Sequence, residues 1–83
     1  MFFFFLQGKT RLWPSIKSFA ERKLAMLDAA TSILDLRSPP GNRLEALDGS
    51  RSGQYSERIN AQFRICFVWS IGGPEDVEIV DYH

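Results

Sequence analysis

The chain has 83 residues, and its ten basic and ten acidic side chains leave no formal net charge. A domain of this size buries only about 60–65% of its unfolded surface, so we expect no deep, self-contained substrate cavity. A neutral chain is also poorly suited to bind nucleic acid alone, because affinity for the phosphate backbone comes from lysine and arginine. Seven of the ten basic residues nevertheless fall between Lys9 and Arg43, which allows a local basic patch.

The N-terminal run Met1–Leu6 contains four consecutive phenylalanines. It lacks the leading positive charge and the length of a signal peptide, and it is far shorter than the roughly 20 residues that span a bilayer. We interpret it as a core segment, either the end of a helix or an edge strand. The single cysteine, Cys66, lies in an apolar run and is interpreted as a small buried hydrophobe. With one cysteine and one histidine, we expect no disulfide within the chain and no metal site. We also expect a cytoplasmic protein that needs no cofactor and contacts no membrane.

A helical pattern covers residues 14–30. Its apolar side chains recur at three- and four-residue steps, which is typical of one face of a helix: Ile16, Phe19, Ala20, Leu24 and Leu27. A shorter apolar segment follows over residues 28–36, with Thr31 or Ser32 as a plausible cap. The sequence Pro39-Pro40-Gly41 ends it, because proline cannot continue a helix.

After Gly41 the pattern changes to strands, which we predict at residues 43–47, 55–59, 62–69 and 77–82 with glycine-containing turns between them. The third strand is the most apolar, and its odd-numbered residues from Phe63 to Trp69 form one face. Arg64 then projects from the opposite face, which we expect to be open to a ligand. The order of elements predicts an α+β fold, with two N-terminal helices packed on a small antiparallel sheet, as one domain over residues 1–83.

The sequence contains no glycine-rich phosphate loop, no G-x-S-x-G and no H-E-x-x-H motif, so the classes of enzyme that use them are excluded. The arginines offer different chemistry, because a planar guanidinium holds a phosphate through two hydrogen bonds. Arg64 lies in mid-strand, and the neighbouring elements carry three more arginines that are candidates for RNA binding: Arg43, Arg51 and Arg58.

Cleavage of RNA by its own 2′-hydroxyl needs a base, an acid and positive charge on the phosphate. His83 is a candidate acid or base because the pKa of histidine lies near neutrality. Asp81 is placed to orient it, and Tyr82 to stack on a base or donate a proton. The plainer interpretations stay open here: His83 as a passive terminal residue, Arg64 as a paired structural arginine, and the carboxylates from Glu75 to Glu78 as a solvated face.

Several segments together resemble the HigB branch of the RelE/ParE toxin superfamily, the plasmid maintenance system killer family. The likeness covers about residues 8–83 and is carried by an ordered set of segments: Leu27–Thr31, Pro39–Leu47, Gly53–Ser56, Arg58–Asn60, Arg64–Phe67 and Val77–His83.

The resemblance implies a toxin of a type II toxin–antitoxin pair that cuts mRNA in the ribosomal A site without a metal. It implies a microbial RNase-like sheet and a HigA-like helix-turn-helix antitoxin, through which alone the toxin meets operator DNA. By position, Arg64 matches the strand arginine that contacts the scissile phosphate, and Asp81, Tyr82 and His83 match the terminal catalytic group.

The chain departs from the family pattern in three places. Met1–Leu6 stands where the first helix of family members ends, so we expect the opening strand to be missing through N-terminal truncation. Glu45 and Asp48 replace a histidine and a lysine of some relatives, and Glu57 stands where an apolar residue is common. Three hypotheses follow: a ribosome-dependent endoribonuclease, an attenuated toxin that only binds its antitoxin, and an interaction module unrelated to RNA.

Overall fold

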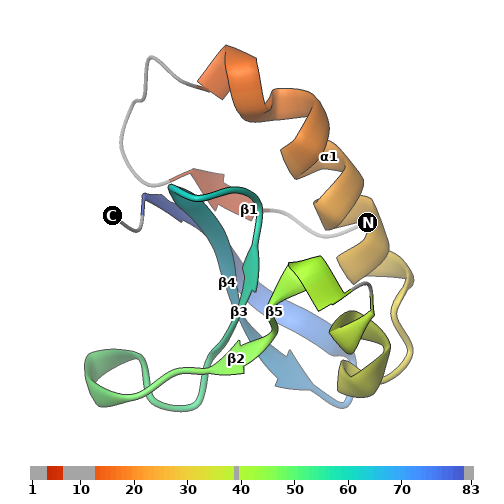
Figure 1. Cartoon of the computed structure of the whole chain (residues 1–83). Helices are drawn as coiled ribbons and strands as arrows, with labels where there is room; N and C mark the ends of the chain where they lie inside the picture. Colours follow the sequence, from red (N-terminus) through yellow and green to blue (C-terminus); the bar gives the residue numbers. More distant parts are fainter. Residues whose placement is uncertain (1–3, 7–12, 39, 82–83) are drawn as a thin grey trace.

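The computed structural model describes residues 4–6, 13–38 and 40–81, except for the side chains of residues 4–6, 13 and 15. Its elements, in chain order, are β1 (Phe4–Leu6), α1 (Trp13–Ala29), the 3₁₀ helices η1 (Ile33–Arg37) and η2 (Pro40–Asn42), β2 (Glu45–Ala46), the 3₁₀ helix η3 (Gly49–Arg51), β3 (Tyr55–Arg58), β4 (Phe63–Ser70) and β5 (Gly73–Asp81). The strand order is β1-β5-β4-β3-β2, and α1 packs against the sheet (Figure 1). The α+β class is confirmed.

Helix α1 buries one side against the sheet. Four of its five predicted core residues are buried: Ile16, Ala20, Leu24 and Leu27. The fifth assignment is wrong, because Phe19 is 52% exposed. Its ring lies instead under the guanidinium of Arg22, 5.8 Å from the ring centroid, a cation–π contact between neighbours one turn apart on the helix surface.

The prediction of two N-terminal helices is wrong: the segment after α1 forms the five-residue 3₁₀ helix η1. A capping box begins it, in which the Ser32 side chain accepts from the backbone of Leu34 and the Asp35 side chain accepts from the backbone of Ser32. Hydrogen bonds from Thr31 and Ser32 lower the pKa of Asp35. Proline at residues 39 and 40 leaves no room for a second full helix, and the segment contributes only Leu36 to the buried core.

The four strands β2 to β5 pair antiparallel in sequence order. On β4 the predicted apolar face is confirmed, since Phe63, Ile65 and Phe67 are at most 2% exposed and belong to the core cluster beneath α1. Trp69 is only half-buried at the end of the strand. Strand β5 begins four residues earlier than predicted, at Gly73, because the tight turn after Ser70 lets pairing with β4 begin at once.

A fifth strand, β1, lies outside the predicted antiparallel sheet. It pairs in parallel with β5, with Phe4 opposite Val77 and Leu6 opposite Ile79. The expectation that the opening strand is missing is therefore wrong, and of the two interpretations of Met1–Leu6 the edge strand is confirmed for residues 4–6. The run supplies aromatic residues that favour strands and covers an edge of β5 that would otherwise expose unpaired backbone groups.

Glu57 is a carboxylate inside the core. It pairs with Ile65 across β3 and β4, is 0% exposed, and neither oxygen has a hydrogen-bond partner among the described residues. Burial raises its pKa from 4.5 to about 7, and the positive charge of Lys23 on α1 offsets part of that effect. The expectation that Glu57 perturbs the core is consistent with this environment, because a buried charge without hydrogen bonds is destabilising.

We predict that Glu57→Leu stabilises the protein at neutral pH by about 1–3 kcal/mol. The folded carboxyl has the higher pKa, so the wild type loses stability as the pH rises from about 4.5 to about 7, whereas the variant lacks this slope. Urea denaturation at pH 5 and pH 8 measures both effects. Glu21→Leu, a matched change on the exposed side of α1, should alter neither by more than about 0.5 kcal/mol. An unchanged pH slope in Glu57→Leu would contradict the assignment.

Candidate functional site

Arg64 is the centre of the candidate site and projects from the side of β4 opposite the core. Its Nε donates to Oγ of Ser56 at 2.9 Å, and one Nη donates to the backbone carbonyl of Arg43 at 2.7 Å. The same Nη lies 3.8 Å from a carboxylate oxygen of Glu45. Ser56 and Glu45 are a cross-strand pair of β3 and β2, so three successive strands supply one side of the sheet with the arginine and two of its partners.

The prediction that Arg64 lies on an open face is wrong, because only 11% of its side chain is exposed. Besides Ser56, two residues from the segment before β3, Arg43 and Glu45, lie beside the guanidinium. The interpretation of Arg64 as a paired arginine is confirmed. A paired arginine still carries positive charge, and in a largely desolvated place that charge acts more strongly on an approaching anion than it would in water.

Arg58 is the second arginine of this side of the sheet. It pairs directly with Arg64 across β3 and β4, and the side chains of such a pair share one face. Two like charges directly opposite one another are unfavourable, and Arg58 forms no ion pair with another described residue. An anion bound on this face would offset the two positive charges.

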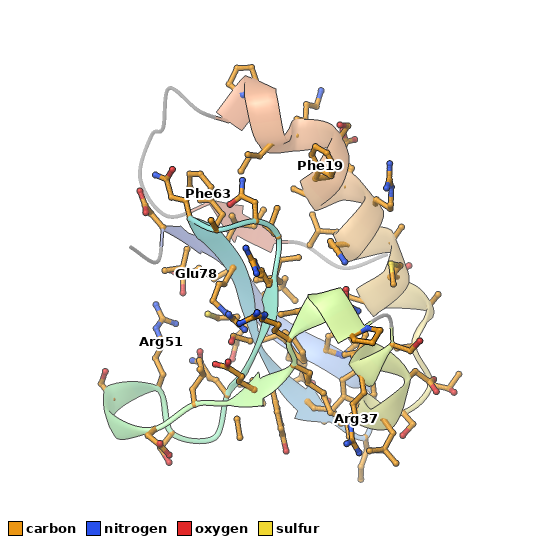
Figure 2. All side chains as sticks on the ribbon, viewed as in Figure 1. Phe19, Arg37, Arg51, Phe63 and Glu78 are labelled. Atoms are coloured by element: carbon orange, nitrogen blue, oxygen red, sulfur yellow. The ribbon has the colours of Figure 1, made fainter. Side chains whose placement is uncertain are left out.

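Arg51 and Arg43 are the other two predicted RNA-binding residues. Arg51 leaves η3 and reaches β5, where it pairs with Glu78 at 3.1 Å and also donates to Gln54 at 3.0 Å (Figure 2). Arg43 is exposed and has a φ of 47°, in the left-handed region that residues other than glycine rarely adopt. The backbone carbonyl of Arg43 accepts a hydrogen bond from Arg64, while its own charged side chain is exposed to solvent.

Asp81 lies on a different side of the sheet from Arg64. Its cross-strand partner is Phe63, a core residue, whereas Arg64 pairs with Val80. Alternation therefore places the Asp81 side chain with Phe63, where Gln62 donates to it at 3.0 Å. Tyr82 and His83 lie outside the described residues, so the terminal catalytic group stays a prediction.

Cys66 is 0% exposed, as predicted, and burial raises the pKa of its thiol, which keeps it in the unreactive protonated form. The described residues include no group of three or more histidine, cysteine, aspartate or glutamate side chains that would hold a metal. In the same part of the chain, no helix has the length and hydrophobicity to cross a membrane.

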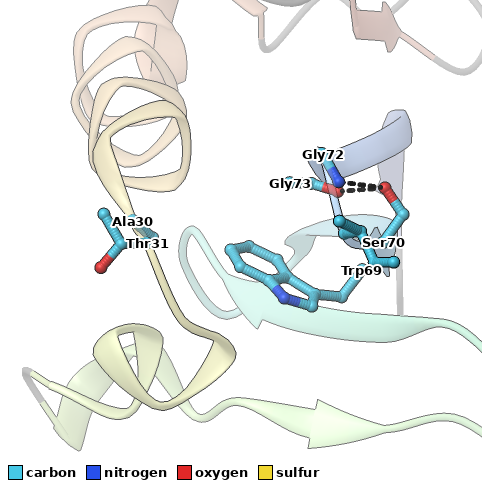
Figure 3. Close-up of a pocket in the computed structure, with 7 residues that line it drawn as sticks. Ala30, Thr31, Trp69, Ser70, Gly72 and Gly73 are labelled. Atoms are coloured by element: carbon cyan, nitrogen blue, oxygen red, sulfur yellow. Dashed lines mark hydrogen bonds between the residues drawn. The ribbon is translucent and has the colours of Figure 1, made fainter.

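A hollow of about 480 Å³ lies elsewhere, between the end of α1 and the β4–β5 turn. Figure 3 shows the Trp69 indole projecting toward the helix end, with Ser70 bonded across the turn to Gly72 and Gly73. Its lining has no charged side chain: Ala30, Thr31, Trp69, Ser70, Ile71, Gly72 and Gly73. It therefore lacks the chemistry to hold a phosphate, and Arg64 is not part of it.

Comparison with known proteins identifies the family of the chain. The family model for the RelE-like toxin of the type II toxin–antitoxin system HigB matches residues 1–83. The chain belongs to this HigB-like toxin family.

Two curated relatives and one solved structure are similar to parts or all of the chain. Toxin HigB-1 of Vibrio cholerae is 51% identical over 63 residues, which are 75% of this chain and 66% of that protein. An uncharacterized protein of Haemophilus influenzae is 48% identical over 46 residues, 55% of this chain and 46% of that one. The chain thus spans less than two thirds of either relative. A YoeB–YefM complex from Staphylococcus aureus contains a chain with a TM-score of 0.51 and 18% identity, covering 100% of this chain and 98% of that one, which shows a likeness of fold.

Sequence reasoning found the arginines of this HigB-like chain but missed what holds Arg64. Ser56 lay inside a family-like segment, and its place two residues before Arg58 on a predicted strand was a usable signal, because that spacing puts both on one face. The Arg43 carbonyl had no such signal. A backbone acceptor is brought to the site by a left-handed residue, and nothing in the residue type arginine predicts that conformation.

We predict that Glu45→Gln tightens binding of a single-stranded RNA oligonucleotide roughly two- to five-fold, because it removes a carboxylate that competes with phosphate for Arg64. Fluorescence anisotropy at fixed ionic strength measures the affinity. Asp48→Asn removes the same charge from an exposed residue whose side chain caps nothing, and it should have the smaller effect. Equal gains from the two variants would mean that net charge, and not the contact with Arg64, limits binding.

Proposed function

We propose that this HigB-like chain is a ribosome-dependent mRNA endonuclease that inhibits translation as the toxin of a type II toxin–antitoxin pair. The observation that carries the proposal is the arginine pair of β3 and β4. Arg64 is held in one orientation by two hydrogen bonds, and Arg58 stands directly across the strand without an ion pair to any described residue. Two arginines on one face of neighbouring strands carry the charge and the planar donors that a phosphodiester requires.

The proposed reaction is attack of a ribose 2′-hydroxyl on the adjacent phosphorus, with departure of the 5′-oxygen of the next nucleotide. The products are a 2′,3′-cyclic phosphate and a free 5′-hydroxyl, and in the proposed reaction side chains of the chain supply the positive charge and the proton transfers without a metal. Arg64 stabilises the charge that grows on the non-bridging phosphate oxygens, and one well-placed donor of this kind contributes about 10²- to 10³-fold to the rate. Arg58 holds the neighbouring part of the backbone.

The acid and base are assigned to the terminal group. His83 takes the proton of the attacking 2′-hydroxyl, and Tyr82, which also stacks on a base of the splayed mRNA, gives a proton to the departing 5′-oxygen. Asp81 acts from the end of β5. Asp81 shares the face of Phe63, so its proposed role is to fix the direction of the chain that follows it, beginning with the contact to Gln62.

The small surface around Arg64 supports the proposed dependence on the ribosome. Only 11% of the Arg64 side chain is exposed, and the hollow beside Trp69 is lined by no charged side chain. A surface of this kind cannot wrap an mRNA by itself. A partner that presents the strand in a fixed, splayed conformation supplies the orientation that the domain does not, and orientation accounts for a large share of catalysis.

The proposed partners are the ribosome with its mRNA and a HigA-like helix-turn-helix antitoxin, and the proposed place of action is the cytoplasm. Operator DNA is met only through the antitoxin, because the formally neutral chain lacks the cationic excess of a DNA-binding protein. The solved complex with a similar fold pairs the toxin YoeB with YefM, which supports an arrangement of toxin and antitoxin for this chain.

A second function is favoured by the acidic partners of the arginines. Glu45 lies beside Arg64 and Glu78 pairs with Arg51, so two of the four arginines face a carboxylate. This arrangement supports an attenuated toxin that binds its antitoxin and cleaves RNA slowly or not at all. It predicts co-purification with a helix-turn-helix partner and little inhibition of growth.

We predict that Arg64→Lys lowers mRNA cleavage about 10²- to 10³-fold, since lysine keeps the charge but loses the fork of donors. Each variant is induced in cells and the 5′ ends of mRNA are mapped. His83→Ala should remove the same cleavage sites, whereas Arg37→Lys, on the exposed surface of η1, should keep them.

Identical cleavage maps for the wild type, Arg64→Lys and His83→Ala would end the catalytic proposal. Absence of cleavage in the wild type, together with a co-purified antitoxin, would select the attenuated toxin instead.

A further inference from the structure

We propose that Ser56 is a positioning residue, whose hydroxyl sets the orientation in which Arg64 meets the scissile phosphate. This inference rests on the proposed function and adds a residue to its site. Ser56 is 0% exposed, and its Oγ accepts from Nε of Arg64 at 2.9 Å. It lies on β3 with Cys66 as its partner on β4 and Glu45 as its partner on β2, so it is fixed by pairing on both sides.

Two fixed acceptors define the plane of the guanidinium. One hydrogen bond would allow the planar group to turn about the bond, whereas bonds at both Nε and Nη stop that rotation. The second acceptor is the Arg43 carbonyl at 2.7 Å, which belongs to a residue in the left-handed region with a φ of 47°. Both acceptors are thus parts of the backbone framework or buried against it, and neither is a long flexible side chain.

The position of the Arg43 carbonyl is itself secured by its neighbour. Asn42 is 0% exposed, and its amide donates to the carbonyls of Leu36 and Ser38 at 3.2 Å each. Lys23 on α1 donates to the oxygen of the same side chain. The segment that carries the second acceptor is therefore tied to the helix and to η1, and Ser56 is the matching anchor on the sheet.

A positioning role differs in a measurable way from simple satisfaction of a buried arginine. A guanidinium that is free to turn still attracts RNA, but it meets the transition state less often in the productive geometry, so kcat falls and KM changes little. A small misplacement of a catalytic group costs up to about 10²-fold. If Ser56 had only a structural role, replacing it would lower the fraction of folded protein but not the kcat of the folded molecules.

The kinetic test compares four variants with the wild type in a reconstituted translation assay, and each rate is divided by the folded fraction from circular dichroism. Ser56→Ala and Ser56→Cys should lower kcat about 10- to 100-fold with KM changed less than about two-fold, because sulfur is a weak acceptor. Ser56→Thr restores the hydroxyl and should recover most of the rate. Ser70→Ala, which removes a turn hydroxyl outside the site, should match the wild type. A proportional loss in all three Ser56 variants, or none in Ser56→Ala, would overturn the inference.

An independent measurement separates this inference from the proposed function. In ¹⁵N NMR spectra of the full 83-residue chain, the Arg64 Nε–H signal should exchange slowly with water in the wild type and in Ser56→Thr, and at least ten-fold faster in Ser56→Ala. Titration with inorganic phosphate should shift this signal in the wild type and shift it less in Ser56→Ala. If the wild type cleaves no RNA but these results hold, the proposed function fails and Ser56 still orients an anion-binding arginine. Unchanged exchange and an unchanged phosphate response would refute the role of Ser56.

Discussion

The hydrogen bonds that the buried guanidinium of Arg64 requires determine how the neighbouring segments on this side of the sheet are placed. A charged group that is almost fully removed from water needs a hydrogen-bond acceptor for each buried donor, and an unmet donor costs about 1–3 kcal/mol or more. The two acceptors come from different places in the chain, one eight residues before Arg64 and one 21 residues before it. Strand β3 and the left-handed residue Arg43 must therefore both be in place before these two hydrogen bonds can form.

The opposite side of the sheet also buries an ionisable side chain, but without hydrogen-bond partners among the described residues. Glu57 pairs with Ile65 one position along the strands from Arg64, but among the described residues its oxygens have no hydrogen-bond partner. One face of this short hairpin thus holds the hydrogen-bonded guanidinium of Arg64, and the other holds the carboxyl of Glu57, which has no hydrogen-bond partner among the described residues. The first is consistent with a selected site, and the second weakens the packing of α1 on the sheet. Lys23 connects the two faces, since it bonds Asn42 beside the site and its charge acts on Glu57.

Much of the fold follows from local patterns. The period of apolar residues predicts α1 to within one residue at each end, and alternation along residues 62–69 identifies the core face of β4. The prediction that Phe19 is buried is wrong because burial depends on which side of α1 packs on the sheet. The prediction of a second helix is wrong because the prolines at residues 39 and 40 end the segment too early. Residue type and order were enough to propose the four arginines as candidates. Their burial could not be predicted, because the course of residues 43–54 over the sheet follows from strand pairing and from a left-handed backbone.

The order of the strands also bears on how such a chain folds as it is made. Strand β5 lies between β1 and β4, yet it follows both of them in the sequence. The first strand thus has no partner in the sheet until the last of the five has been synthesised. The ion pair of Arg51 also depends on β5, because Glu78 follows 27 residues later. Contacts this distant in sequence form late and slowly. The β1–β5 pairing therefore forms only after β5 has been synthesised, and a nascent chain that lacks β5 leaves β1 without its partner strand.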